Sequence, residues 1–208
     1  MKHENIVING LPGTGSTTVA KMLSEKLGFE HVYAGGIFRE MARKAGQSLE
    51  VFMAAIIDRP DEERKVDDAL IARLKKGSVI IESRVVAWLL PREIPAYKVW
   101  LTCEFTERVR RISQREPTPD VEDRVKAREQ IDIDRYTRLY NLDLVDLSVF
   151  DRIIDTTSIP ARKVASIIAA DIKSLKQHGK LDRLAMHSQP APKPSAKKRG
   201  VRKSAKKD

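Results

Sequence analysis

A glycine-rich segment at residues 10–18, GLPGTGSTT, constrains this chain more than any other feature. The apolar run NIVING precedes it, and TVAKMLSEKLG, which has helical spacing and ends in a glycine, follows it. A strand that runs through a glycine-rich loop into a helix is typical of an α/β fold. Glycines let successive backbone N–H groups converge on an anion, and the next helix adds its positive N-terminal dipole. The loop is therefore predicted to bind phosphate.

The segment departs from the P-loop pattern at one position. The pattern is Gly, four residues, Gly, Lys and then Ser or Thr, and the chain has Gly10, Gly15 and Thr17 but Ser16 in place of the lysine. Thr17 can offer its hydroxyl to Mg²⁺, whereas the cation that the lysine supplies must come from elsewhere or be absent. The alternative is a glycine-rich turn that binds no ligand. We predict instead that ATP binds along the whole loop, at Gly10, Leu11, Pro12, Gly13, Thr14, Gly15, Ser16, Thr17 and Thr18.

Strand and helix patterns alternate along the rest of the chain, which favours an α/β fold with a mainly parallel sheet. Strands are predicted at residues 5–10, 31–36, 78–83, 97–103 and 152–158, and the second of them runs into a turn. Helices are predicted at residues 18–28, 37–46, 48–60, 61–77, 105–116, 121–141 and 160–178. A Pro-rich break, PTPD, separates the two charged helices at 105–116 and 121–141.

Composition excludes several classes of protein. With 208 residues, 41% of them apolar, the chain suits one domain of ordinary size plus an appendage. No stretch approaches the roughly 18 apolar residues that cross a bilayer, and the N-terminal residues lack the apolar run of a signal peptide. The single cysteine, Cys103, excludes an internal disulfide or a metal site of several cysteines, and its apolar neighbours predict a buried thiol. We expect a cytoplasmic protein with no membrane partner, and we take it to be a monomer.

Residues 187–208 differ in character from the rest of the chain. From Ser188 to Asp208 there are eight Lys or Arg and one Asp, a net charge of +7, which leaves +3 of the total of +10 for the preceding residues. The segment has no aromatic residue, so it is predicted to be a disordered basic tail behind a folded domain at 1–186. Such an arm neutralises polyanions and would bind nucleic acid without sequence preference. The alternative is a solubilising end with no dedicated partner.

Several segments together resemble the archaeal-type cytidylate kinase family. They are GLPGTGSTTVAKMLSEKLGFEHVYAGGIFREMA, VIIESRVVAWLL, YKVWLT, RVRRISQRE and RYTRLYNLDLVDLSVFDRIIDTTS. The resemblance extends from about Asn5 to about Ile172, and that family also replaces the lysine of the loop. It implies a P-loop nucleoside-monophosphate-kinase fold, in which helices flank a five-stranded parallel sheet. It also implies an acceptor-binding segment at about 34–75 and an arginine-rich lid at about 108–135.

The resemblance also assigns residues to the acceptor phosphate. Arg39, in AGGIFR, and Arg84, in ESR, match positions that bind this phosphate in the family. Glu82 is expected near the water shell of the Mg²⁺ that Thr17 binds. Ser83 stands where the family has glycine, and it adds a side chain where backbone and substrate approach each other.

Arginines recur in the two charged helices. Arginine suits phosphoryl transfer because its planar fork pairs with phosphate and stays charged. Helical spacing places three arginines on one face of the first helix, and two arginines with an aspartate on one face of the second. These residues are Arg108, Arg111 and Arg115, and then Arg128, Asp132 and Arg135. The alternative is two solvated helices with local ion pairs. The resemblance favours a lid, with Arg108, Arg111 and Arg128 catalytic and with Asp132 and Arg135 at the substrate.

The expected function is ATP-dependent phosphorylation of CMP or dCMP. A carboxylate that accepts a hydrogen bond from the cytosine amino group would favour CMP over UMP, and Asp132, Asp67 and Asp68 are the candidates. One alternative is a kinase for another acceptor, such as AMP, UMP, shikimate or dephospho-coenzyme A. A second alternative, which Ser16 and the basic tail favour, is a catalytically weak or inactive P-loop protein associated with nucleic acid or ribosomes.

Overall fold

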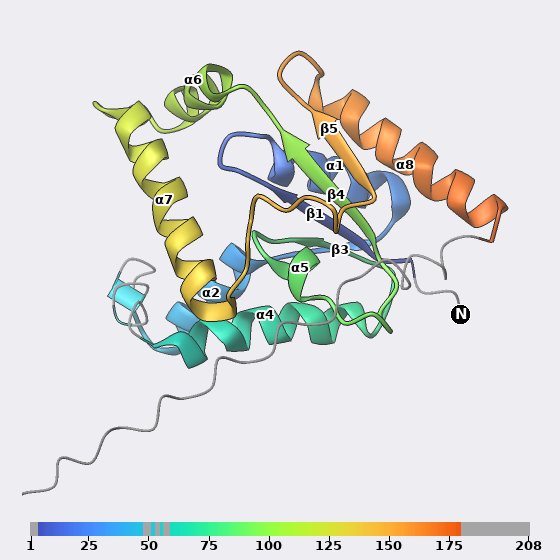
Figure 1. The fold of residues 1–208 in the computed structure, drawn as a ribbon, viewed down its shortest axis with the longest axis horizontal. Coiled ribbons are helices and arrows are strands. Elements are labelled where there is room, and N and C mark those ends of the chain that lie inside the picture. The colour runs from blue at the N-terminus through green and yellow to red at the C-terminus, as the bar shows by residue number, and fades with distance from the viewer. Residues whose placement is uncertain (1–3, 48–50, 53–54, 56–58, 180–208) are drawn as a thin grey trace, which may run out of the picture.

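The computed structural model describes residues 4–47, 51–52, 55 and 59–179 (Figure 1). Most of the helix predicted at 48–60, and the whole basic tail predicted at 187–208, lie outside this part of the chain. Within the described residues, no helix is both long enough and apolar enough to span a membrane.

Five strands form a single parallel sheet. They are β1 (Ile6–Gly10), β2 (Glu30–Tyr33), β3 (Val79–Glu82), β4 (Tyr97–Thr102) and β5 (Arg152–Asp155). Their order is β2-β3-β1-β4-β5, and every neighbouring pair is parallel. β1 is buried along its whole length, as expected of a central strand covered on both faces. The predicted five-stranded parallel sheet is confirmed.

Helices cover both faces of this sheet. They are α1 (Ser16–Leu27), α2 (Ala34–Lys44), α4 (Pro60–Leu74), α5 (Val86–Leu89), α6 (Phe105–Arg115), α7 (Val121–Tyr140) and α8 (Ala161–Gln177). α1 and α8 bury their apolar sides against one face, while α4, α5 and the segment before β5 pack against the other. α6 and α7 form an arm beyond the sheet, and α7 returns toward α4 (Figure 1).

Three local predictions differ from the structure. Residues 34–36, AGG, were predicted as the end of the second strand, where it runs into a turn, but they form the first turn of α2. α5 was not predicted, because a helix of four residues is too short to show a helical repeat. Cys103 is half-buried rather than buried.

The carboxyl edge of the sheet positions the functional residues. Central β1 runs directly into the glycine-rich loop, and its neighbour β3 ends at Glu82, which pairs in register with Ile8 of β1 and with Tyr33 of β2. Because the strands are parallel, the segments that follow them meet at one edge. Ligands of open α/β sheets bind at this edge.

Candidate active site

The glycine-rich loop depends on glycine for both conformation and space. Gly13 and Gly15 have φ values of 87° and 90°, in the left-handed region that favours glycine. A Cβ on Gly13 would lie 2.8 Å from the Cβ of Arg108, and a Cβ on Gly10 would lie 2.9 Å from the carbonyl oxygen of Leu101. The loop is therefore fixed closely against β4 and α6, with its backbone turned at the N-terminus of α1.

Glu82 accepts hydrogen bonds from two hydroxyl groups at the start of α1. Thr17 Oγ1 and Ser16 Oγ donate hydrogen bonds to Glu82 Oε1 over 2.6 and 2.8 Å, and His31 Nε2 lies 3.2 Å from Glu82 Oε2. Burial raises the pKa of Glu82, but the hydrogen bonds from His31, Thr17 and Ser16 outweigh it, so the pKa lies below its ordinary value. The carboxylate is therefore ionised at neutral pH. Ser16, which stands at the lysine position, contributes a neutral donor and no cation.

Thr17 and Glu82 fit a magnesium ion. No group of three or more His, Cys, Asp or Glu side chains among the described residues could hold a metal by itself. Mg²⁺ in phosphoryl-transfer sites does not require one, because it binds through one or two protein oxygens together with phosphates and water. The hydroxyl of Thr17 and the ionised carboxylate of Glu82 provide such hard oxygen ligands beside the loop.

A second charged cluster joins the end of β3 to α7. Arg84 donates from Nη1 to the carbonyl oxygen of Gly10, and its Nε lies 3.3 Å from Asp132 Oδ2. Arg135 Nη2 lies 3.1 Å from Asp132 Oδ1, so both carboxylate oxygens are engaged by arginines. Burial lowers the pKa of Arg84, while the Asp132 charge raises it. The structure thus brings three predicted substrate residues together, directly beside the first glycine of the loop.

Ser83 turns away from this cluster. Its side chain is buried, and its Oγ accepts hydrogen bonds from the backbone N–H groups of Val85 and Val86 over 3.1 and 3.2 Å. The hydroxyl therefore satisfies backbone donors at the start of α5. The side chain that replaces glycine here is accommodated inside the fold.

Arg39 lies on α2, apart from the Arg84 cluster. Its Nη1 donates to Tyr33 Oη over 2.9 Å, and its guanidinium lies 5.6 Å from the centre of that ring.

The two other aspartates that were candidates for the cytosine amino group are on α4. Asp67 is buried and accepts a hydrogen bond from Tyr140 Oη over 2.6 Å, whereas Asp68 is exposed.

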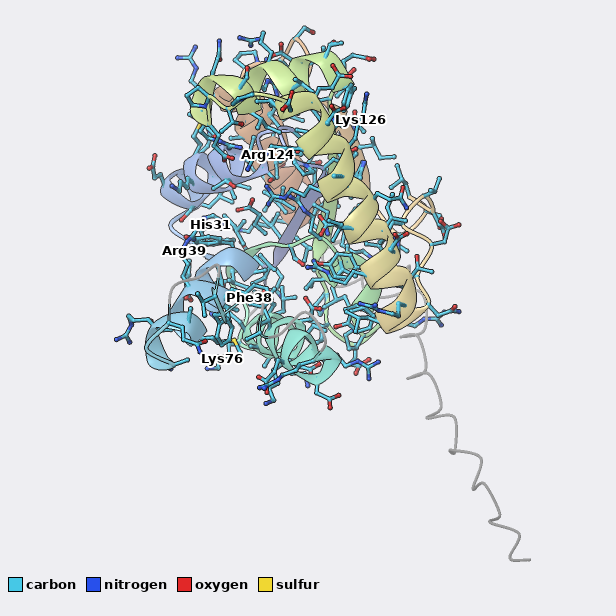
Figure 2. The ribbon with its side chains drawn as sticks, turned by 90° about the vertical axis from the view of Figure 1, so that its left-hand side faces the viewer. His31, Phe38, Arg39, Lys76, Arg124 and Lys126 are labelled. Atoms are coloured by element: carbon cyan, nitrogen blue, oxygen red, sulfur yellow. The ribbon has the colours of Figure 1, made fainter. Side chains whose placement is uncertain are left out.

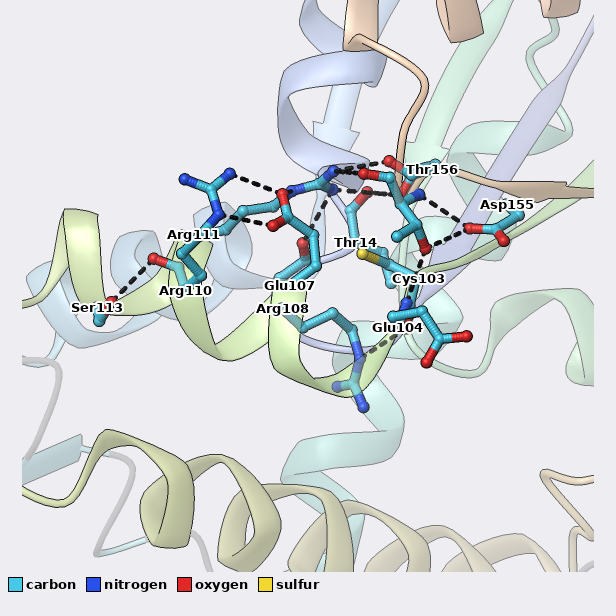
Figure 3. A network of polar contacts seen from close by, with 12 residues as sticks. Thr14, Cys103, Glu104, Glu107, Arg108, Arg110, Arg111, Ser113, Asp155 and Thr156 are labelled. Carbon is cyan, nitrogen blue, oxygen red and sulfur yellow. Dashed lines mark hydrogen bonds and ion pairs between the residues drawn. The ribbon is translucent and has the colours of Figure 1, made fainter.

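Two arginines of α6, Arg108 and Arg111, anchor that helix to the glycine-rich loop. Figure 3 shows the polar network of α6 with the segment after β5, in which Arg111 contacts Thr156. Arg108 is buried, donates to the carbonyl oxygen of Pro12 over 3.2 Å and pairs with Glu129 of α7. Arg111 donates to the carbonyl oxygens of Thr156 and Gly13 over 2.6 and 3.4 Å. Both catalytic candidates of α6 therefore contact the backbone of the loop.

Arg115 and Arg128 are exposed. Arg115 makes a single ion pair with the adjacent Glu116, over 3.5 Å. Arg128 makes no hydrogen bond or ion pair with any residue that the structure describes, but its charge is close enough to lower the pKa of Arg84. A cation on α7 thus lies near the cluster of Arg84, Asp132 and Arg135, which we call the acceptor-side cluster after the role expected from the sequence, and no carboxylate among the described residues pairs with this cation.

A cavity of about 290 Å³ adjoins the loop on the side of α6 and α8. Its wall combines the start of α1, one side of α6 and the segment between β5 and α8. The lining residues are Thr14, Gly15, Thr18, Val19, Glu107, Arg110, Arg111, Thr156, Ile159, Pro160, Ala161 and Val164. The residues after β5 were not predicted as part of the site, because no local motif marks them and only the fold brings them to the loop.

The chain is similar to several known proteins. The AAA domain family model matches residues 6–133. A cytidylate kinase of Methanocaldococcus jannaschii is 38% identical over 176 residues, which cover 83% of this chain and 99% of that protein. A cytidylate kinase of Methanopyrus kandleri is 37% identical over 181 residues, which cover 82% of this chain and 93% of that protein.

Solved structures share the fold at lower identity. A shikimate kinase from Acinetobacter baumannii in complex with shikimate has a TM-score of 0.54 and 20% identity, over 83% of this chain and 94% of that one. An uncharacterized protein from Eubacterium ventriosum has a TM-score of 0.63 and 18% identity, over 83% of this chain and 99% of that one. At these identities the likeness shows the fold alone.

Proposed function

This chain belongs to the cytidylate kinase family, and from that premise we propose that it transfers the γ-phosphoryl group of ATP to CMP or dCMP. One observation carries the proposal. The bond between Arg84 and the carbonyl oxygen of Gly10 joins the acceptor-side cluster directly to the phosphate loop. A donor phosphate on the loop and an acceptor phosphate on Arg84 would therefore be neighbours.

On the donor side, the loop and the adjoining cavity bind different parts of ATP. The N–H groups of the loop and the N-terminus of α1 bind the phosphates, and the cavity beside Arg111 and Pro160 takes the nucleoside. Thr17 and Glu82 would hold Mg²⁺, which when bound neutralises charge on the donor phosphates. Glu107 stays ionised beside Arg110 and Arg111, whose hydrogen bonds lower its pKa to about 2.

On the acceptor side, arginines bind and orient a dianion. Arg84 and Arg39 bind the CMP phosphate, whose attacking oxygen is already deprotonated at neutral pH and needs no general base. Asp132 and Arg135 lie next to Arg84, and we assign Asp132 to the cytosine amino group. The carboxylate would then exchange one of its arginine contacts for the base.

The missing lysine is replaced by arginines of the two charged helices. α6 and α7 act as a lid with a break between them, and the pairing of Arg108 with Glu129 holds α7 against α6. Arg128, which has no carboxylate partner among the described residues, supplies a mobile cation to the transferring phosphoryl group when the lid closes. Exclusion of water would strengthen this charge interaction.

An acceptor panel tests the proposed specificity. ADP release from ATP is measured with CMP, dCMP, UMP, AMP and shikimate in turn, and catalytic efficiencies are compared. We expect CMP and dCMP to exceed UMP by at least tenfold, because uracil lacks the amino group that would pair with a carboxylate. Preference for AMP or shikimate would assign the chain another acceptor, and ATP binding without any turnover would favour an inactive P-loop protein.

Arg111→Ala is expected to weaken ATP binding selectively. Arg111 lines the cavity that would hold the donor nucleoside, so its loss should raise the KM for ATP by about tenfold, equivalent to ~1.4 kcal/mol. The KM for CMP, measured in the same variant, is the internal control and should change by less than about twofold. Because Arg111 also binds the carbonyl oxygen of Thr156, thermal unfolding without ATP shows whether the fold is intact. An unchanged KM for ATP would mean that the nucleoside of ATP does not bind in this cavity.

Truncation after Met186 tests the role of the basic tail. The tail lies beyond the family match, so CMP phosphorylation should stay within about twofold, or under ~0.5 kcal/mol in the barrier. The tail has a net charge of +7, so it should bind DNA or RNA at low salt, and its affinity should fall steeply as the salt concentration rises. A gel-shift titration should therefore lose nucleic-acid retention on truncation. Loss of kinase activity would instead make the tail part of the enzyme.

A further inference from the structure

Tyr33 lies at the junction between β2 and the helix that carries Arg39. Its hydroxyl accepts the hydrogen bond from Arg39 Nη1 over 2.9 Å, and its ring lies under the same guanidinium. A Cβ on Gly36 would come within 3.0 Å of this ring, and a Cβ on Gly35 within 3.5 Å. The two glycines at the start of α2 therefore leave room for the phenol ring beside the helix N-terminus.

The same ring is stacked on His31. The centres of the two rings are 5.4 Å apart, and their planes differ by 25°. His31 in turn contacts Glu82 over 3.2 Å, and its side chain is only 9% exposed. Figure 2 shows His31 and Arg39 beside each other on the β2–α2 side of the molecule. A continuous set of contacts thus runs from Glu82 through His31 and Tyr33 to Arg39.

We propose that Tyr33 is a positioning residue that holds Arg39 for the acceptor phosphate, and that His31 ties this arrangement to Glu82 on the donor side. The inference rests on the proposed function, in which Arg39 binds the CMP phosphate. It adds two residues, Tyr33 and His31, to which the proposed function assigns no contact with phosphate. It also accounts for the glycine at position 36, because a Cβ there would lie only 3.0 Å from the Tyr33 ring.

Arg39 needs a positioning residue because an arginine side chain at the surface is otherwise free to adopt many rotamers. Arg39 is exposed, and among the described residues its guanidinium is held only by Tyr33 and by the carbonyl oxygen of Gly35, over 3.3 Å. An unrestrained side chain of this type loses rotamer entropy when it is ordered. Holding it before the ligand arrives removes part of that cost, which improves acceptor binding more than turnover.

Tyr33→Phe tests the link to Arg39, because it removes the hydroxyl and keeps the ring. We expect the KM for CMP to rise three- to tenfold and kcat to stay within about twofold. In an Arg39→Ala background the same change should have no further effect, because Tyr33 acts through Arg39. Tyr97→Phe is the matched control. It also loses one phenolic hydrogen bond, to Asp171 over 2.8 Å, but on the α8 face of the sheet, so the KM for CMP should not change.

Two variants test the link from His31 to Glu82. His31→Phe keeps a ring against Tyr33 and loses the contact with Glu82, whereas His31→Ala loses both. Calorimetry of CMP without metal should give wild-type affinity for His31→Phe and at least threefold weaker binding for His31→Ala. ATP binding should need more Mg²⁺ in both variants. Thermal unfolding identifies any variant that fails to fold, and Tyr33→Phe still tests the Arg39 link.

The outcomes separate this inference from the proposed function. If Arg39→Ala raises the KM for CMP and Tyr33→Phe does not, the positioning role is overturned and the kinase assignment stands. Additive effects in the double variant would also overturn it, because Tyr33 would then act independently of Arg39. If the wild-type protein neither binds nor phosphorylates CMP, the proposed function itself fails.

Discussion

Replacing Arg84 by alanine is expected to lower the catalytic efficiency toward CMP by about 30- to 1000-fold. This range corresponds to ~2–4 kcal/mol, the loss that accompanies removal of a charged partner of a phosphate. The effect is large because Arg84 both binds the acceptor phosphate in the proposed complex and contacts the carbonyl oxygen of Gly10. Initial rates over a range of CMP concentrations, at saturating ATP, give the measurement.

Two variants control this experiment. Arg84→Lys keeps the charge but loses the planar fork, so it should recover only part of the efficiency. Arg92→Ala removes an exposed arginine from the segment before β4, at the opposite edge of the sheet, and should have wild-type activity. Asp132 keeps Arg135 as a partner in Arg84→Ala, so the fold should persist in thermal unfolding. If Arg84→Ala keeps the wild-type catalytic efficiency toward CMP, Arg84 does not bind the acceptor phosphate.

Thr17→Ala is expected to reduce turnover by one to three decades, or ~1.4–4 kcal/mol in the barrier. The substitution removes the hydroxyl that we assign to Mg²⁺, and it removes one hydrogen bond from Glu82. The Mg²⁺ concentration that gives half-maximal rate should rise at the same time.

Thr17→Ser is the matched control, because it keeps the hydroxyl and removes only a methyl group. It should stay within a fewfold of wild type in turnover and in Mg²⁺ requirement. Near-normal turnover of Thr17→Ala would mean that the loop does not hold the metal. Equal losses in both variants would instead point to packing of the methyl group.

The parts of the fold that depend on local pattern could be predicted. β1, the glycine-rich loop and α1 are consecutive in the chain, so their order and the Gly28 stop are visible in the sequence. The long charged helices were also located closely, because each repeats its pattern over several turns. The lid that these helices would form stays a prediction.

The contacts between distant segments could not be predicted. The cavity combines Thr18 with Pro160, and only the packing of α8 against α1 brings them together. The pairing of Asp132 with Arg84 was likewise not visible, because the two residues are far apart in sequence. The role that we propose for Tyr33 rests on its hydrogen bond with Arg39 and its stacking on His31, and not on any motif.

Transfer of labelled phosphate tests the central claim most directly. ATP labelled at the γ-phosphate is incubated with the purified full-length chain, CMP and Mg²⁺, and the labelled products are separated. We predict label in CDP, no label without added Mg²⁺, and at least a 30-fold lower rate for Arg84→Ala. Label that appears only in inorganic phosphate, or remains in ATP at every CMP concentration, would contradict the assignment of this chain as a CMP kinase.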